Sequence, residues 1–131
     1  MKKLVLFLVL ATCCNNMFAH YWKGNDIYAF SLRQAGIYLD LFGFIGDESA
    51  SMYMNGSRGE FTYANVTRKL TFVSFNRSTR YLVLNEYDRQ GKYIGKFKGK
   101  CTIYNGMVSQ YNGTFVNIRG GKVSFRLHAG N

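Results

Sequence analysis

The stretch GKYIGKFKGKC at residues 91–101 decides the fold of this chain, because its lysines alternate with apolar and small residues. Successive side chains of a β-strand point to opposite faces of a sheet. A strand over Tyr93–Thr102 therefore directs Phe97 and Cys101 to one face. The other face carries Lys96, Lys98 and Lys100. We expect Phe97 and Cys101 to be buried and the lysines to form the solvent-facing side of the sheet.

Two glycines share the predicted inner face of this strand. Gly95 and Gly99 lie two residues before and two residues after Phe97. A glycine inside a strand permits sharp coiling or the close approach of another segment. We therefore expect either a strongly coiled strand or aromatic rings that cross these glycines from a neighbouring strand.

The rest of the chain repeats this strand pattern. It contains no proline, and short runs of β-branched and aromatic residues are separated by Gly, Asn, Asp and Ser. No stretch keeps the apolar spacing of an amphipathic helix for long. The predicted strands are Ile27–Leu32, Ile37–Phe42, Ser51–Asn55, Glu60–Ala64, Lys69–Phe75, Tyr81–Tyr87, Tyr93–Thr102, Met107–Val116 and Lys122–Leu127, with a short start at His20–Lys23. In the strand at Met107–Val116, the alternation assigns Tyr111 to the inner face and Val108 to the outer face.

Short turn sequences separate these strands. Asn55-Gly56, Asn105-Gly106 and Gly120-Gly121 are pairs that supply the positive φ angles of tight hairpins. Links this short favour antiparallel neighbours. The predicted fold is all-β, an antiparallel up-and-down meander of about eight strands that closes, or nearly closes, into a small barrel and so hides its edges. The alternative is a two-sheet sandwich.

The amino terminus has the pattern of a bacterial export signal. Two lysines precede the apolar run Leu4–Ala11, which is much shorter than the roughly 20 residues needed to cross a bilayer. Residues 1–19 are the predicted signal peptide, and residues 20–131 form a single β domain that is periplasmic or secreted. The alternative is a lipoprotein signal that ends before Cys13. Lipidation of Cys13 would then attach the protein to the outer membrane.

Net charge limits the classes of partner that we expect, and the cysteine count limits the disulfide bonds. The net charge is +10, and removal of residues 1–19, which hold two lysines and no acid, leaves +8. Such an excess attracts acidic polysaccharide, anionic lipid and nucleic acid. We do not expect nucleic acid, because the aromatic side chain of Phe97 faces away from the lysines of its strand and because the protein is predicted to be exported. Cleavage after residue 19 leaves Cys101 as the only thiol, so no disulfide scaffold is expected.

Glu86 is an acidic residue at a predicted buried position. It lies in phase with Leu82 and Leu84 and so points toward the side that those leucines bury. A buried carboxylate requires a partner or is neutralised by a raised pKa. The candidate partners are Arg33, Arg80 and Arg126. A structural ion pair is the expected role, with ligand orientation as the alternative.

Tyrosine is abundant for a core of this size, with 10 in the chain. Tyrosine suits sites that are half apolar and half wet, such as ligand mouths and protein interfaces. Cross-strand pairing of exposed tyrosines is the alternative explanation. The predicted ligand-binding residues are Glu86, Tyr53, Tyr81, Tyr111 and Phe97.

Six short motifs carry a resemblance to a known class of protein. They are a Y-x-x-G start at Tyr21–Gly24, MYMNG at Met52–Gly56, LVLNE at Leu82–Glu86, GKFKG at Gly95–Gly99, YNGTF at Tyr111–Phe115 and VSFRL at Val123–Leu127. Their succession resembles small exported bacterial β-barrel domains of the lipocalin-like, or calycin-like, kind. The resemblance implies a meander barrel, often with an internal cavity, and no set of catalytic residues.

Motifs for catalysis and metal binding are missing from the sequence. There is no G-x-S-x-G elbow, H-E-x-x-H or C-x-x-C pattern. The two histidines, His20 and His128, stand near opposite ends of the predicted domain. We therefore predict no catalytic residues, no metal and no cofactor, and we do not expect an enzyme.

The predicted function is that of a non-enzymatic envelope or secreted protein that binds a small apolar molecule, a glycan or another protein. The alternative is an inhibitor or structural partner of an enzyme, acting through an exposed loop such as Gly43–Ser51. A barrel interior filled by side chains would argue against a lipid carrier. A protruding loop with exposed Phe42, Phe44 and Ile45 would favour a protein partner.

Overall fold

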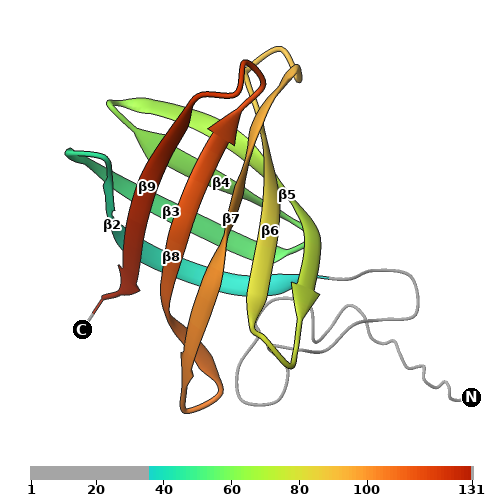
Figure 1. Ribbon diagram of the computed structural model, residues 1–131, viewed down its shortest axis with the longest axis vertical. Coiled ribbons are helices and arrows are strands. Elements are labelled where there is room, and N and C mark those ends of the chain that lie inside the picture. The colour runs from blue at the N-terminus through green and yellow to red at the C-terminus, as the bar shows by residue number, and fades with distance from the viewer. Residues whose placement is uncertain (1–35, 131) are drawn as a thin grey trace, which may run out of the picture.

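The computed structural model describes residues 36–130, which form a closed barrel of antiparallel strands (Figure 1). Each strand pairs with the next along the chain. In chain order they are β2 (Ile37–Ile45), β3 (Glu48–Gly56), β4 (Arg58–Tyr63), β5 (Val66–Asn76), β6 (Tyr81–Tyr87), β7 (Tyr93–Tyr104), β8 (Met107–Asn117) and β9 (Lys122–Ala129). The predicted all-β meander is thereby confirmed. The predicted strands at 20–23 and 27–32, and the predicted export signal, lie outside the described residues.

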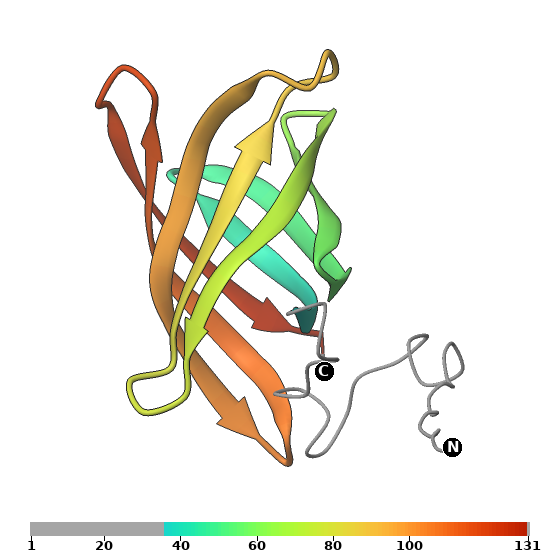
Figure 2. The ribbon, with the colours of Figure 1, turned by 90° about the vertical axis from the view of Figure 1, so that its right-hand side faces the viewer.

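Pairing between the first and last described strands closes the barrel. β2 and β9 run antiparallel, with pairs from Leu41 and Ala129 to Ile45 and Phe125. Figure 2 shows the strands wrapping around a common axis, with β9 returning to β2. The alternative prediction of a two-sheet sandwich was wrong, because a single sheet returns on itself and so leaves no free edge among β2–β9.

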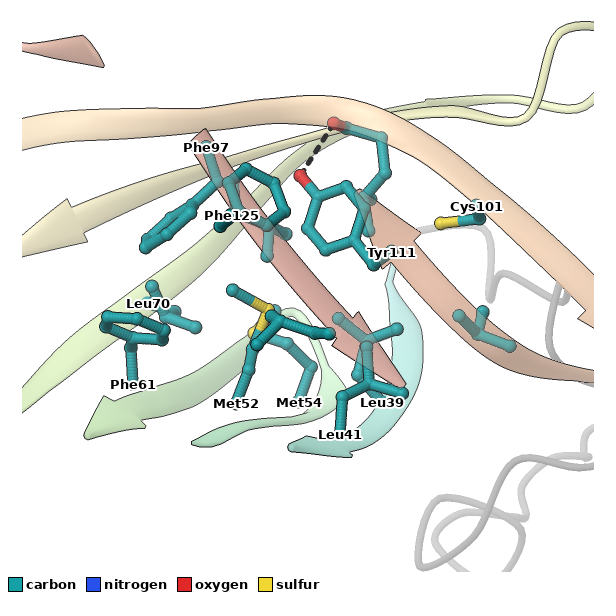
Figure 3. Packing of buried hydrophobic residues seen from close by; sticks show 14 of the residues in the cluster. Leu39, Leu41, Met52, Met54, Phe61, Leu70, Phe97, Cys101, Tyr111 and Phe125 are labelled. Carbon is teal, nitrogen blue, oxygen red and sulfur yellow. Dashed lines mark hydrogen bonds between the residues drawn. The ribbon is translucent and has the colours of Figure 1, made fainter. Parts of the chain in front are cut away.

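Buried side chains from all eight strands pack together in the interior, and Figure 3 shows part of this cluster. Phe97 lies at the centre of an aromatic group, with ring centroids 4.7 Å from Phe61, 4.7 Å from Phe115 and 5.2 Å from Phe125. Tyr111 packs against Phe125 at 4.8 Å. Small eight-stranded barrels have an interior just wide enough for side chains to fill. The core is completed by leucine, isoleucine and methionine side chains from β2, β3, β5, β6 and β9.

The stretch at residues 91–101 lies as its alternation predicts. Phe97 and Cys101 are buried, Lys98 and Lys100 are exposed, and Lys96 is half-buried. The expectation for the glycines is also confirmed. A Cβ atom added to Gly95 would lie 2.5 Å from Cζ of Phe115, so this ring from β8 crosses the glycine.

Gly99 faces Gly113 across the pair of strands β7 and β8. A Cβ atom on Gly99 would collide with the backbone of β8, including Cα of Gly113 at 2.8 Å. A Cβ atom on Gly113 would likewise lie 2.5 Å from Cα of Gly99. The two strands therefore approach so closely on the inner side that neither position has room for a side chain.

Local irregularities explain where the predicted alternation failed. The register of β7 and β8 shifts between Thr102 and Ile103, so Ile103 pairs with Val108 while Thr102 pairs with Gln110. The extra residue on β8 is Ser109, and Val108 is buried rather than exposed as predicted. A bulge of this kind moves one segment of a strand to the opposite phase.

One turn lies where the sequence predicted the end of a strand. Tyr63 pairs with Val66, so Ala64 and Asn65 form a two-residue hairpin turn. Their φ angles are 52° and 63°. Two successive positive φ angles are typical of a type I′ turn, which favours Asn-Gly, and alanine at the first position carries no such signal.

Replacing Gly99 with Ala should destabilise the barrel by about 2–3 kcal/mol, because the new methyl group meets backbone rather than a movable side chain. Urea unfolding would measure the loss. Gly130→Ala is the matched control, since its nearest neighbours are ring atoms of the exposed Phe42, and it should change stability little. Equal stability of the two variants would contradict the close approach of β7 and β8.

Replacing Ala64 with Asn should raise stability by about 0.5–1 kcal/mol, because asparagine tolerates the left-handed conformation better than alanine. Thermal unfolding would detect the gain as a higher Tm. Ala64→Val should act in the opposite direction, since a β-branched residue is strongly disfavoured at positive φ.

Candidate functional site

The five predicted ligand-binding residues do not gather at one place. Phe97 and Tyr111 are fully buried in the core, where both rings pack against Phe125. The hydroxyl of Tyr111 donates a hydrogen bond of 2.8 Å to the carbonyl oxygen of Leu82, as drawn in Figure 3. Tyr53 on β3 and Tyr81 on β6 lie on the outer surface, each 43% exposed. Glu86 is the fifth and lies inside.

Glu86 points into the barrel, as its phase with Leu82 and Leu84 predicts, and only 3% of its surface is exposed. It pairs with Leu70 on β5 and Gly95 on β7. Burial raises the pKa of its carboxyl group to about 7, and the charge of Arg68 acts in the opposite direction. Within residues 36–130, no side chain forms a hydrogen bond or an ion pair with this carboxyl group.

The arginine that influences Glu86 differs from those expected. Arg126 is exposed on β9, Arg80 lies in the turn before β6, and Arg33 lies outside the described residues. Arg68 was missed because its proximity depends on the register of β4, β5 and β6. Arg68 pairs with Phe61 and stands two residues before Leu70, the partner of Glu86. Spacing along the sequence contains no signal for that register.

The buried thiol and phenol are poor nucleophiles. Burial raises the pKa of the Cys101 thiol to about 12, with the charge of Arg80 opposing the shift. Burial likewise raises the pKa of Tyr111. Both groups therefore remain protonated near neutral pH, and a thiol in this state does not attack a substrate. His128 is exposed on β9.

Aromatic and acidic side chains gather on the outer side of β2, β3 and β4, which we call the acid–aromatic face. It comprises Tyr38, Asp40, Phe42, Phe44, Tyr53 and Glu60. Phe42 is 48% exposed and Phe44 46% exposed. Asp40 and Glu60 flank Tyr53 directly in the register of the three strands. Tyr38 meets Tyr53 edge to face, with ring centroids 5.9 Å apart.

A shallow groove of about 590 Å³ extends this face toward one end of the barrel. Phe42 lines it together with the acidic residues Asp47 and Glu48 and with Tyr63 and Asn65. The segment 43–51, predicted as an exposed loop, is instead the β2–β3 hairpin with only Gly46 and Asp47 between the strands. Ile45 is buried, so the exposed aromatic residues are carried by a strand rather than by a protruding loop.

The opposite side of the barrel has a different charge. We call it the basic face, and it comprises Lys96, Lys98 and Lys100 on β7, Tyr81, Val83 and Asn85 on β6, and Asn112 and Thr114 on β8. Tyr81 pairs directly with Lys100, and Asn85 with Lys96. The outward positions of β6, β7 and β8 include no acidic residue. Figure 1 shows these strands on the other side of the barrel from β2 and β3.

The basic face brings an aromatic ring beside the lysines, although alternation along β7 separates the two kinds of side chain. Alternation along β7 places Phe97 opposite the lysines, which was the reason to expect no aromatic ring beside them. β6 instead contributes Tyr81 to the same surface as Lys100. Only the pairing of β6 with β7 brings these residues together, so a single strand cannot predict it.

No group of three or more His, Cys, Asp or Glu side chains among residues 36–130 is arranged to hold a metal ion. In the same part of the chain, no helix is long and apolar enough to cross a membrane. The oxygen Oδ1 atoms of Asn55 and Asn85 are buried without a hydrogen-bond partner.

Replacing Glu86 with Gln should stabilise the protein at alkaline pH and change little at pH 4.5 or below. The folded-state pKa of about 7 exceeds the ordinary value of 4.5, so the folded protein holds the proton more tightly than the unfolded chain. The stability due to protonated Glu86 is complete below pH 4.5 and is lost as the pH rises through 7. The variant should gain up to about 3 kcal/mol at pH 8.5.

Urea unfolding of both proteins between pH 4.5 and pH 8.5 would measure this difference. Glu60→Gln, a change on the outer surface of β4, is the matched control and should show no comparable trend. A Glu86→Gln variant that is less stable than the natural protein at pH 8.5 would mean that the carboxylate has a stabilising partner.

Comparison with known proteins adds no relative from which a function could be transferred. No protein-family description, curated protein or solved structure matches the chain. In general shape, the closed antiparallel barrel of eight strands is that of lipocalin-like proteins. The two outer faces are therefore the candidate functional sites of the described barrel.

Proposed function

We propose that this chain is an exported, non-enzymatic binding protein of lipocalin-like architecture that binds another protein through its acid–aromatic face. The observation that carries the proposal is the pair of outward rings, Phe42 and Phe44, each close to half exposed on a barrel whose interior is filled. Export is supported by the sequence pattern of residues 1–19.

The filled interior favours a partner bound outside the barrel. A carrier of small apolar molecules needs an internal cavity, and lipocalin-type barrels that hold a ligand leave such a space. Here Phe97, Tyr111 and Phe125 occupy the centre of the barrel. Among the three classes of ligand expected from the sequence, a protein fits these observations best.

The composition of the acid–aromatic face resembles that of protein interfaces. Aromatic side chains are enriched at the centres of such interfaces, and a few of them carry most of the binding energy. Phe42 and Phe44 lie two residues apart on the same side of β2, beside Tyr53. Asp40 lies two residues before Phe42, and Asp47 and Glu48 line the groove beside that ring. These acids favour a partner with basic residues on this side of the rings, while Arg126 on β9 pairs with Phe44 on the other.

The alternative function, inhibition or structural support of an enzyme, would use the same surface. The groove beside Phe42 ends at the β2–β3 turn, where Asp47 and Glu48 are exposed. An enzyme with a basic rim around its active site would then be the partner. Identifying the bound protein as an enzyme or as another kind of protein would distinguish this alternative function from the first.

Replacing both Phe42 and Phe44 with Ser should weaken binding to the partner by about 10–100-fold, since each buried aromatic anchor contributes about 1 kcal/mol or more. Crosslinking in the source cells would identify proteins that contact the chain, and titration with the purified candidate would give Kd.

The matched control replaces Val73 and Ile118, which are exposed apolar residues outside the acid–aromatic face, with Ser. It should retain the affinity of the natural protein. Unchanged affinity of the Phe42→Ser, Phe44→Ser variant for every crosslinked protein would contradict a binding role for this face.

A further inference from the structure

We propose that the basic face binds an acidic polysaccharide, with the polymer lying along β7. This inference concerns the side of the barrel opposite the acid–aromatic face and does not depend on the protein partner. Acidic residues are concentrated in residues 40–60 and basic residues after residue 66, and the fold places the strands of these two segments around opposite sides of the barrel.

The charges of the described residues are sorted by position around the barrel. Four acidic residues, Asp40, Asp47, Glu48 and Glu60, lie on β2–β4 and the turn between β2 and β3. Arg58 is the only basic residue of that part. From residue 66 onward the acidic residues are Glu86, which is buried, and Asp88, which lies in the β6–β7 turn. The outward positions of β6, β7 and β8 therefore carry their lysines with no acid beside them, whereas Lys69 on β5 faces Glu60 on β4.

Asp88 is occupied within its own turn. One oxygen of its carboxylate accepts hydrogen bonds from the backbone N–H groups of Gln90 and Lys92, each 2.9 Å long. This acid therefore helps to shape the β6–β7 turn and lies beyond the end of the lysine row. The positive potential over β7 is left without a local counter-charge from β6 or β8.

The lysines form a regular row. Lys96, Lys98 and Lys100 alternate along one strand, so their Cα atoms are spaced by about 6.8 Å. A flexible polymer with an anionic group on each sugar can place successive charges along such a row. A small anion would need one converging pocket, whereas this surface presents its charges in a line.

Neutral side chains on both sides of the row suit sugar. Tyr81 pairs with Lys100 from β6, while Asn112 pairs with Lys100 and Thr114 with Lys98 from β8. The tyrosine ring offers an apolar face for the C–H groups of a pyranose together with a hydroxyl group. The amide and hydroxyl groups of Asn112 and Thr114 can exchange hydrogen bonds with sugar hydroxyls.

The same observations disfavour the other polyanions. A single-stranded nucleic acid is held by several aromatic rings on which successive bases stack, within a positive groove. The basic face lies on the convex outside of the barrel, and the rings that β6 places beside the lysine row, Tyr81 and Tyr87, stand at its two ends rather than in succession. An anionic lipid surface is favoured by protruding apolar side chains. Here the apolar partners of the lysines are Val83 on β6 and Val116 on β8, and both are half-buried.

Titration calorimetry at 0.15 M salt would test this proposal with four probes: an oligomer of a polyuronate, neutral dextran of the same length, a single-stranded oligonucleotide, and phosphatidylglycerol vesicles. The natural chain should bind the polyuronate most tightly and the dextran undetectably. Replacing Lys96, Lys98 and Lys100 with Gln should weaken polyuronate binding about tenfold and make it less sensitive to salt.

The matched control replaces Lys69, Lys92 and Lys122 with Gln, which removes the same charge from positions outside the lysine row of β7. It should retain most of the affinity. Tyr81→Ala should weaken polyuronate binding without changing its dependence on salt, because the tyrosine carries no charge. Equal losses in both lysine variants would overturn the proposal, since net charge alone would then explain binding. Tighter binding of the oligonucleotide or of the vesicles would also overturn it.

Discussion

The narrow interior of an eight-stranded barrel is the constraint on which the rest of this structure depends. The interior of such a barrel is just wide enough for the inward side chains of its strands, and these side chains must pack closely. Phe97 occupies the centre and touches the rings of Phe61, Phe115 and Phe125. These rings fit because nearby inner positions have no side chain, as at Gly95 beneath Phe115. The large rings therefore depend on the neighbouring glycines for the space that they occupy.

Because side chains from all eight strands pack inside the barrel, the proposed binding sites of this molecule lie on its outer surface. The inner groups that could react, Cys101 and Tyr111, are held protonated by burial. Glu86 is the one charged side chain that burial leaves inside among residues 36–130. Outside, residues of β2–β4 supply aromatic rings and acids, while β6–β8 supply lysines, amides and hydroxyls. The same barrel therefore presents two surfaces that would attract different partners.

The sequence predicted two kinds of feature: which side chains point inward, from the two-residue alternation along a strand, and where turns lie, from their characteristic residues. Phe97 and Glu86 were placed inside, and the turn at Asn105-Gly106, where both φ angles are positive, was correctly identified. Contacts across strands were not predictable, because register depends on the packing of the whole barrel. Arg68 beside Glu86 and Tyr81 beside Lys100 are examples. Ala64 also escaped prediction, because alanine in a turn has no characteristic signature.

The separation of acidic and basic residues gives the folded chain a permanent electric dipole across the barrel. A body of this kind experiences a torque in the field of a charged surface as well as an attraction. Near a negatively charged surface, the molecule would turn β6–β8 toward that surface before contact. Phe42 and Phe44 would then point away into the surrounding medium, already oriented to meet another molecule.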